Sequence, residues 1–348
     1  MSTQIALALT EIGKPLTKIS VPGPDTFELG ANELLIKLTA AGLAPHDQKI
    51  RDRNLMNVGS RLPAILAGDL VGTVVKAGTD VSLSFPIGAQ ILAQASFKVP
   101  TDGGLQSYTV VNGSFAAIVP PGIPATEAAL YPINAFTSVM ALFTPAGFGL
   151  PFPQTPESQT FDYASQKLVI IGGGSNTGKL AVQFARIAGI GTIIAMASLS
   201  NTTALKEFGA THVIARQDPD IESQVRQIVG DDLIYVFDTV STGEYSLALS
   251  LLSSTKRGTL IHLVGGKMDE ALIAQKKAGV DHRHISGFSG AIPEFGRLFW
   301  KVFSSWLESG QVKPLPYTVI EGLDADKVNA ALDQYRDGTG SVRYHVKL

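Results

Sequence analysis

The sequence predicts an α/β protein in which a doubly wound parallel sheet follows a β-rich domain. The apolar run 168–171 leads into a glycine cluster and then into helical spacing, as expected for a strand, a turn and a helix. From there to about residue 264, short apolar strands alternate with helices, which is typical of a parallel sheet. Residues 1 to about 125 instead carry short strands separated by Pro and Gly. A chain of 348 residues exceeds one hydrophobic core, so we expect about two domains.

The first part of the chain is expected to be all-β. Alternating apolar residues predict a strand over 33–41, and Gly72 and Gly78 accompany a second strand over 69–76. The Pro and Gly punctuation favours a partly open barrel with long loops. Further strands are predicted over 88–94, 106–111 and 115–119.

From residue 125 the apolar period becomes helical. It predicts helices over 126–130 and 135–143, followed by a Pro-rich surface loop over 144–166. The parallel sheet is expected to use strands over 168–171, 192–196, 212–214, 233–238 and 258–264, with helices from 179, 203, 221 and 244. The last part predicts an aromatic helix over 293–308, a strand near 317, a helix over 325–335 and a strand over 342–346. The predicted domain segments are 1–128, 129–288 and 289–348, the last returning to the first domain.

Composition narrows the class of protein. A net charge of −2 and the absence of basic clusters give no footprint for nucleic acid or an anionic membrane, so a small-molecule partner is expected. The chain has no cysteine, which excludes disulfides, cysteine-ligated zinc and thiolate catalysis. The start lacks the basic segment of a signal peptide, and prolines and polar residues interrupt the apolar stretch 130–150. We therefore expect a cytoplasmic protein without a membrane span.

The glycine cluster predicts a phosphate-binding turn. Glycine allows a tight turn and a close approach to an anion, which the N–H groups of the next helix then bind. Residues 173–179 also fit the pattern of a phosphate loop, but that pattern requires a hydroxyl next, where this chain has Leu180. A dinucleotide pyrophosphate is favoured over a turn without a ligand. Its expected contacts are Gly173, Gly174, Ser175, Asn176 and Thr177.

The residue expected to contact the adenosine ribose is Ser198, after the second strand. NAD sites usually carry Asp or Glu here, and a chain without that carboxylate accepts a 2′-phosphate. Ser200, Asn201, Lys206 and Arg216 lie nearby in sequence and favour NADPH, although Arg216 also fits an exposed residue at a strand end. After the last central strand, Val264, Gly265 and Gly266 are expected beside the nicotinamide carboxamide, or else form an ordinary turn.

The order of these parts resembles the medium-chain dehydrogenase/reductase superfamily over nearly the whole chain. The motifs that carry the resemblance are GDLVGTVVKAG (68–78), GGLQSY (103–108), ALYPINAFT (129–137), the glycine turn and FGATHV (208–213). The resemblance implies a GroES-like first domain, a Rossmann second domain and a substrate cleft between them. It is closest to zinc-free quinone oxidoreductases and to fungal enoyl reductases that act in trans on polyketide synthases.

The chain departs from the zinc alcohol dehydrogenases at their metal ligands. Where those enzymes have Gly-His-Glu, this chain has Gly68-Asp69-Leu70, and Ala44 replaces the first cysteine ligand. His46 and Asp47 are expected to be a hydrogen-bonding or capping pair in a loop. The pair His282 and His284 is expected to be exposed, so we predict no metal.

A zinc-free member must act on an acceptor that is already activated for hydride transfer. We therefore expect hydride transfer from NADPH to a conjugated carbonyl or a quinone, with hydrogen-bond donors stabilising the enolate oxygen. Lys49 matches a cleft lysine of the fungal enoyl reductases, although it also fits a solvated residue of a charged loop. Tyr108 and Asn134 are further candidates, and Thr137 is expected beside the nicotinamide or bonded within its own helix.

Two other functions remain open at this point. One is a zinc-independent carbonyl reductase that acts on aldehydes or ketones. The other is a non-catalytic NADPH-binding protein, which the lack of basic clusters disfavours as an RNA-associated form. The resemblance also implies a possible homodimer through the edge of the Rossmann sheet, while some of the fungal enoyl reductases are monomers.

Overall fold

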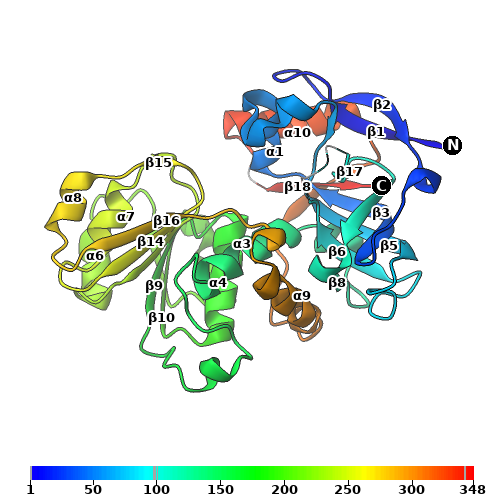
Figure 1. Ribbon diagram of the computed structural model, residues 1–348. Helices are drawn as coiled ribbons and strands as arrows, with labels where there is room; N and C mark the ends of the chain where they lie inside the picture. The colour runs from blue at the N-terminus through cyan, green and yellow to red at the C-terminus, as the bar shows by residue number, and fades with distance from the viewer. Residues whose placement is uncertain (1, 97–98, 100, 341) are drawn as a thin grey trace. The chain divides into compact units, whose positions relative to one another are not determined.

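The computed structural model describes residues 2–96, 99, 101–340 and 342–348. The chain divides into two compact units (Figure 1). Unit 1 holds Met1–Ile133, Phe288–Ser309 and Pro314–Leu348, and unit 2 holds Asn134–Gly287 and Gly310–Lys313. The three domain segments expected from the sequence remain a prediction.

Unit 1 is built on two sheets. The larger has the strand order β17-β18-β3-β5-β6-β8, with β7 also paired to β3, and the smaller has the order β2-β1-β4. In the larger sheet, β3 (Glu33–Gly42) pairs antiparallel with β5 (Asp69–Ala77), β7 (Tyr108–Asn112) and β18 (Arg343–Lys347). The other strands are β1 (Thr3–Leu9), β2 (Thr17–Pro22), β4 (Ala64–Ile65), β6 (Gln90–Gln94), β8 (Ala116–Ile118) and β17 (Tyr317–Glu321).

Helices cover the sheets of unit 1. The helix α1 (Pro45–Arg53) packs against α10 (Ala325–Asp337), and the Arg51 guanidinium lies 2.6 Å from the Asp333 carboxylate across this contact. The long α9 (Pro293–Glu308) buries an aromatic face that includes Phe299, Trp300 and Phe303. The short α2 (Ala125–Ala128) precedes α3 (Pro132–Phe143), which begins in unit 1 and continues in unit 2.

Unit 2 is a parallel sheet in the order β11-β10-β9-β12-β14-β16, which confirms the predicted doubly wound sheet. Its helices follow the strands in alternation, and β9 lies at the centre (Figure 1). The strands are β9 (Lys167–Ile171), β10 (Thr192–Ala197), β11 (His212–Ala215), β12 (Tyr235–Asp238), β14 (Gly258–His262) and β16 (Val280–His284), with a separate pair β13 (Gly243–Glu244) and β15 (Gly266–Lys267). The helices are α4 (Asn176–Ala188), α5 (Thr202–Phe208), α6 (Ile221–Val229), α7 (Ser246–Leu251) and α8 (Glu270–Gln275).

The segment Gly310–Lys313 returns to unit 2 and binds α4. Gln183 of α4 accepts from the Lys313 N–H at 2.7 Å and donates to its carbonyl at 3.2 Å. Arg186 of the same helix donates to the Gln311 carbonyl. Four residues that follow α9 thus bond to side chains of α4.

The predicted strands and helices of both units are present, with ends shifted by a few residues. The elements β1, β2, β4 and α8 were not predicted, and neither was the edge strand β16, which residues 280–284 form. The side chains of His282 and His284 on β16 are exposed, as predicted. The prediction of a surface loop over 144–166 was wrong in part, because Phe148, Leu150 and Tyr163 are buried.

The interpretation of residues 49–53 as a charged loop, and the placement of His46 and Asp47 in a loop, were wrong, because residues 45–53 form α1. Pro45 stands at the first helical position, and the Asp47 carboxylate accepts from the Ala44 N–H at 2.8 Å, which caps the helix. Arg51 and Arg53 lie in the last turn, where they complement the helix dipole. The helix ends at Asn54 in the left-handed conformation, with φ of 55°.

Candidate functional site

The candidate site lies at the carboxyl ends of β9 and β12. The chain moves outward from β9 through β10 and β11, and then returns to the other side of β9 through β12. Ligands of doubly wound sheets bind at this reversal of strand order. In unit 2 it lies where Ile171 leads into the glycine turn and Asp238 leads into Thr239.

The glycine turn is shaped by close backbone packing. Gly172 has a φ of +76°, which favours glycine. A Cβ on Gly178 would lie 2.3 Å from the Gly172 carbonyl oxygen, so only glycine lets α4 begin this close to the strand. A Cβ on Gly174 would approach the Asn201 side chain to 3.2 Å, so Asn201 comes close to the turn at this residue.

Ser175 caps the N-terminus of α4. Its hydroxyl accepts from the Gly178 N–H at 3.0 Å and lies 2.9 Å from the Thr239 hydroxyl, which in turn donates to the Ile171 carbonyl at 3.0 Å. The first N–H groups of a helix have no acceptor within it, so those of Asn176 and Thr177 can bind an anion. Ser175, which the sequence assigned to pyrophosphate, thus also links the carboxyl ends of β9 and β12.

The ribose side of the site lies at the ends of β10 and β11. The Ser198 and Ser200 hydroxyls lie 3.0 Å apart. Arg216 directly follows Ala215, which pairs with Ala197, and its N–H donates to the Ala197 carbonyl at 2.9 Å. The structure therefore brings Ser198 and Arg216 to neighbouring strand ends.

Lys206 and Arg216, which the sequence associates with the ribose side, are exposed. Lys206 lies on α5, and Arg216 lies after β11. Across the described part of the chain, neither of them is joined to a carboxylate. Both charges are thus available to an anion.

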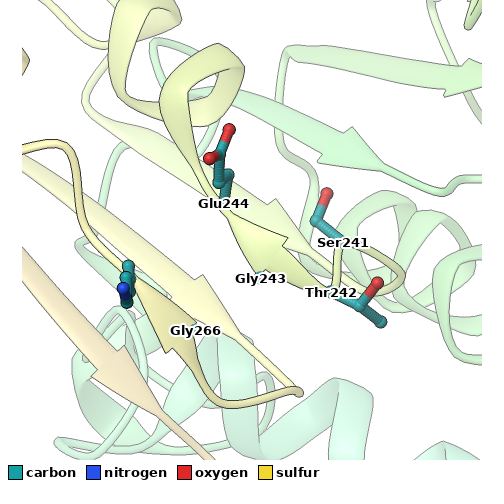
Figure 2. A pocket seen from close by; sticks show the side chains of 6 residues that line it. Ser241, Thr242, Gly243, Glu244 and Gly266 are labelled. Carbon is teal, nitrogen blue, oxygen red and sulfur yellow. The ribbon is translucent and has the colours of Figure 1, made fainter.

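A hollow of about 700 Å³ is lined by the segments that follow β12 and β14 (Figure 2). The strand β13 runs beside β15, with Gly243 paired to Gly266 and Glu244 paired to Lys267. Of these residues only Gly266 was predicted from the sequence, and the turn after β12 was not. The strand order places that turn next to the central strand β9, and its Gly243 has a φ of +107°, but no motif in the sequence marks it. The hollow is lined by Ser241, Thr242, Gly243, Glu244, Gly266 and Lys267.

The two glycines after β14 have different surroundings. A Cβ on Gly266 would lie 2.8 Å from a ring carbon of Tyr245, whereas a Cβ on Gly265 would meet nothing within 4 Å. Gly266 is therefore required by packing, and Gly265 has open space beside its backbone.

The residues predicted on α3 are linked to the start of α4. The Thr177 hydroxyl donates to the Asn134 side-chain oxygen at 3.1 Å. The Ser138 hydroxyl lies 2.8 Å from the Asn134 carbonyl and 2.9 Å from the Thr177 carbonyl. Thr137 is buried, and its hydroxyl lies 1.9 Å from where Gly287 would carry a Cβ. Asn134 is thus tied to the predicted pyrophosphate contact Thr177.

The other two predicted catalytic residues belong to unit 1. Lys49 lies on α1 and is half-buried, and burial lowers the pKa of its amine, with a smaller effect of Arg53 in the same direction. Tyr108 begins β7, and its backbone N–H donates to the Gln4 side chain at 2.8 Å. The position of Lys49 and Tyr108 relative to Asn134 stays a prediction.

The position where zinc enzymes carry a histidine ligand holds a buried ion pair. Asp69 is fully buried, pairs with Arg343 and accepts from the Ile133 N–H at 2.6 Å. Arg343 also donates to the Leu43 carbonyl at 3.0 Å. The Asp47 carboxylate accepts from the backbone of Ala44 and Ala67. The donor set does not fit zinc, and nowhere in the described residues do three His, Asp or Glu side chains gather to hold a metal.

Among the residues that the structure describes, no helix is both long enough and apolar enough to span a membrane.

The chain matches two family models. Residues 30–121 match the alcohol dehydrogenase GroES-like domain, and residues 177–303 match the zinc-binding dehydrogenase domain. The dehydrogenase orsE of Emericella nidulans is 29% identical over 100% of both chains. The trans-enoyl reductase tazE of Aspergillus terreus is 30% identical over 70% of this chain and 80% of its own length.

Solved structures show the same fold. The CurK enoyl reductase superposes with a TM-score of 0.76 at 17% identity, covering 99% of both chains. The quinone oxidoreductase of Pseudomonas syringae also gives a TM-score of 0.76 at 17% identity, covering 99% of this chain and 100% of its own.

These matches establish the class of the protein: an α/β oxidoreductase with a GroES-like domain and a Rossmann-like parallel sheet. The chain belongs to the medium-chain dehydrogenase/reductase superfamily, as the sequence motifs indicated, and fungal trans-enoyl reductases are among its relatives. Members of this superfamily use a nicotinamide nucleotide.

Proposed function

We propose that the protein is an NADPH-dependent reductase of conjugated carbonyls or quinones that works without zinc. The observation that carries the NADPH assignment is the end of β10, where Ser198 and Ser200 stand in place of a carboxylate and Arg216 lies at the neighbouring strand end. A 2′-phosphate carries nearly two negative charges, which an adjacent carboxylate would repel and a guanidinium attracts.

The nucleotide is proposed to lie along the carboxyl edge of the unit 2 sheet. Gly174 and the N–H groups of Asn176 and Thr177 would bind the pyrophosphate, and Gly265 would lie beside the nicotinamide. The bound cofactor supplies a hydride at C4 of its nicotinamide. The nicotinamide end of the nucleotide would lie near the hollow beside Gly266. The closely packed glycine turn has no comparable space.

Substrate class is proposed from the donors that the chain offers. The carboxylate of Asp69 is engaged with Arg343, and the chain has no cysteine, so its side chains do not suit a zinc that would polarise a simple carbonyl. A conjugated acceptor needs only hydrogen-bond donors for the developing enolate oxygen. Lys49, whose pKa is lowered by burial, is the proposed donor, with Tyr108 and Asn134 as further candidates. The enoyl reductases among the relatives support the same class.

Product analysis with deuterated cofactor tests this proposal. With NADPH labelled at C4 and an α,β-unsaturated ketone, we expect the saturated ketone with deuterium on its β-carbon. Prior dialysis against a chelator should leave the rate unchanged. Deuterium on the carbonyl carbon of an allylic alcohol would support the carbonyl reductase instead. Intact NADPH binding with no turnover of enones, quinones or aldehydes would support the non-catalytic alternative.

Substitution at Gly265 tests the placement of the nicotinamide. Because a Cβ here meets no protein atom within 4 Å, Gly265→Ala should leave the melting temperature unchanged. If the carboxamide lies against this backbone, the added methyl should weaken NADPH binding about tenfold, a loss of about 1.4 kcal/mol. Calorimetric titration with NADPH and with 2′,5′-ADP, which lacks the nicotinamide, measures the effect, and only NADPH should lose affinity. Unchanged affinity for both ligands would place the carboxamide elsewhere.

A further inference from the structure

Residues 263–267, called here the β14 exit segment, leave the parallel sheet and reach the hollow of Figure 2. This segment has no regular structure until Gly266 pairs with Gly243. Side chains from three other places in unit 2 nevertheless bind its carbonyl groups. The segment is therefore held before any ligand arrives.

Two buried side chains donate to the Val264 carbonyl. The Tyr245 hydroxyl bonds to this oxygen, and the His262 Nδ1 lies 2.9 Å from it. A carbonyl oxygen only accepts, so Nδ1 of His262 must carry the proton. A carbonyl oxygen has two lone pairs, and both are used here. Val264 therefore has no acceptor left for a ligand.

Tyr245 also supports the rest of the segment. Its side chain is almost fully buried, its ring lies 4.6 Å from the His262 ring, and a ring carbon would lie 2.8 Å from a Cβ on Gly266. Tyr245 thus fixes the Val264 carbonyl with its hydroxyl and packs against Gly266 with its ring. Gly265 lies between these two anchors and has open space beside it.

The edge strand β16 adds a third donor. His284 is the strand partner of His262, and its Nε2 lies 3.1 Å from the Leu263 carbonyl. Burial lowers the pKa of His262, the bond to the Val264 carbonyl opposes this effect, and His284 and His282 lower the pKa further, so the net shift favours the neutral ring. The bond to the Val264 carbonyl requires only that Nδ1 carries a proton, and the neutral Nδ1–H ring meets this requirement.

We propose that Tyr245 and His262 are positioning residues that hold the β14 exit segment in the geometry that receives the nicotinamide half of the cofactor. The inference deepens the proposed function and rests on it. Binding to an ordered segment avoids the entropy cost of ordering it on binding. Loss of these hydrogen bonds should therefore weaken binding of the nicotinamide half of the nucleotide and leave binding of the adenosine half unchanged.

Three variants test the positioning role of Tyr245 and His262. His262→Leu removes the Nδ1 donor, His262→Asn keeps an amide donor near the same place, and Tyr245→Phe removes one hydroxyl while keeping the ring. The first measurement is hydrogen exchange of the ligand-free protein. We expect the amides of the β14 exit segment to exchange about tenfold faster in His262→Leu and Tyr245→Phe, and close to the wild-type rate in His262→Asn. Unchanged exchange in both donor-removing variants would overturn the proposal that Tyr245 and His262 hold this segment, and this result does not depend on any cofactor.

The second measurement separates the two halves of the cofactor. Calorimetric titration of His262→Leu should show about tenfold weaker NADPH binding and unchanged 2′,5′-ADP binding, with His262→Asn restoring NADPH affinity. An equal loss for both ligands would indicate general damage to unit 2 and overturn the positioning role, as would full NADPH affinity in all three variants. A wild-type protein that binds 2′,5′-ADP no better than 5′-AMP would instead contradict the proposed NADPH preference.

Discussion

We expect the Ser198→Glu protein to bind NADPH about 100-fold more weakly than the wild type, a loss of about 2.8 kcal/mol. The new carboxylate would stand at the end of β10, beside the strand end that carries Arg216, where the 2′-phosphate is proposed to bind. The same carboxylate can accept from the 2′-hydroxyl of NADH, so NADH affinity should rise. Calorimetric titration of both nucleotides measures the switch.

Ser198→Ala is the matched control for this prediction. It removes the hydroxyl without adding charge, so NADPH affinity should fall by no more than about tenfold and NADH should gain nothing. An unchanged ratio of the two affinities in Ser198→Glu would show that the 2′-phosphate does not reach the end of β10. A wild type that prefers NADH would contradict the assignment itself.

Replacing Arg343 by Met should reduce the free energy of unfolding by about 3–5 kcal/mol, because it leaves the buried Asp69 carboxylate without its cation. Burial raises the pKa of Asp69 and Arg343 opposes this effect, so the variant should raise that pKa further. When the pKa of a carboxyl is higher in the folded than in the unfolded state, the folded protein loses stability as the pH rises through the folded-state pKa. The deficit should therefore be larger at pH 7 than at pH 5, which urea denaturation at both values measures.

A double variant tests whether the unpaired carboxylate is the cause. Asp69→Asn keeps an acceptor for the Ile133 N–H while removing the charge. Adding it to Arg343→Met should recover about 2 kcal/mol at pH 7, with the remaining loss coming from the Leu43 carbonyl that Arg343 had bonded. Equal losses in the single and double variants, with no dependence on pH, would assign the effect to packing instead.

Much of the fold could be predicted because its signals are local. The strand at 168–171, the glycine turn and α4 are consecutive in sequence, and the alternation of strands and helices after them defines a parallel sheet. The helix α1 gave no such signal, because Ile50 is the one apolar side chain that it buries. Its other buried side chains are polar, and one of them, Arg51, pairs with Asp333 far along the chain. Helical spacing of apolar residues cannot reveal a helix of this kind.

The candidate site was predictable where a motif carries it and not where the fold assembles it. The glycine turn and Ser198 follow from spacing, and the structure brings Gly174 close to Asn201 and Ser198 close to the end of β11. The turn after β12 becomes part of the site only through the strand order, which places β12 next to β9. The roles of Tyr245 and His262 depend on where their donors point, and neither residue belongs to a motif.

The return of Gly310–Lys313 to α4 has a consequence for anyone who wishes to dissect the molecule. A fragment cut at residues 134 and 287 would carry the whole parallel sheet but would strip the outer side of α4 of its backbone partners. Gln183, which is fully buried, would be left facing water or nothing, and Arg186 would lose its bond to Gln311. In such a fragment α4, whose first turn is proposed to bind pyrophosphate, should be less stable. A minimal nucleotide-binding fragment must therefore include Gly310–Lys313 as well.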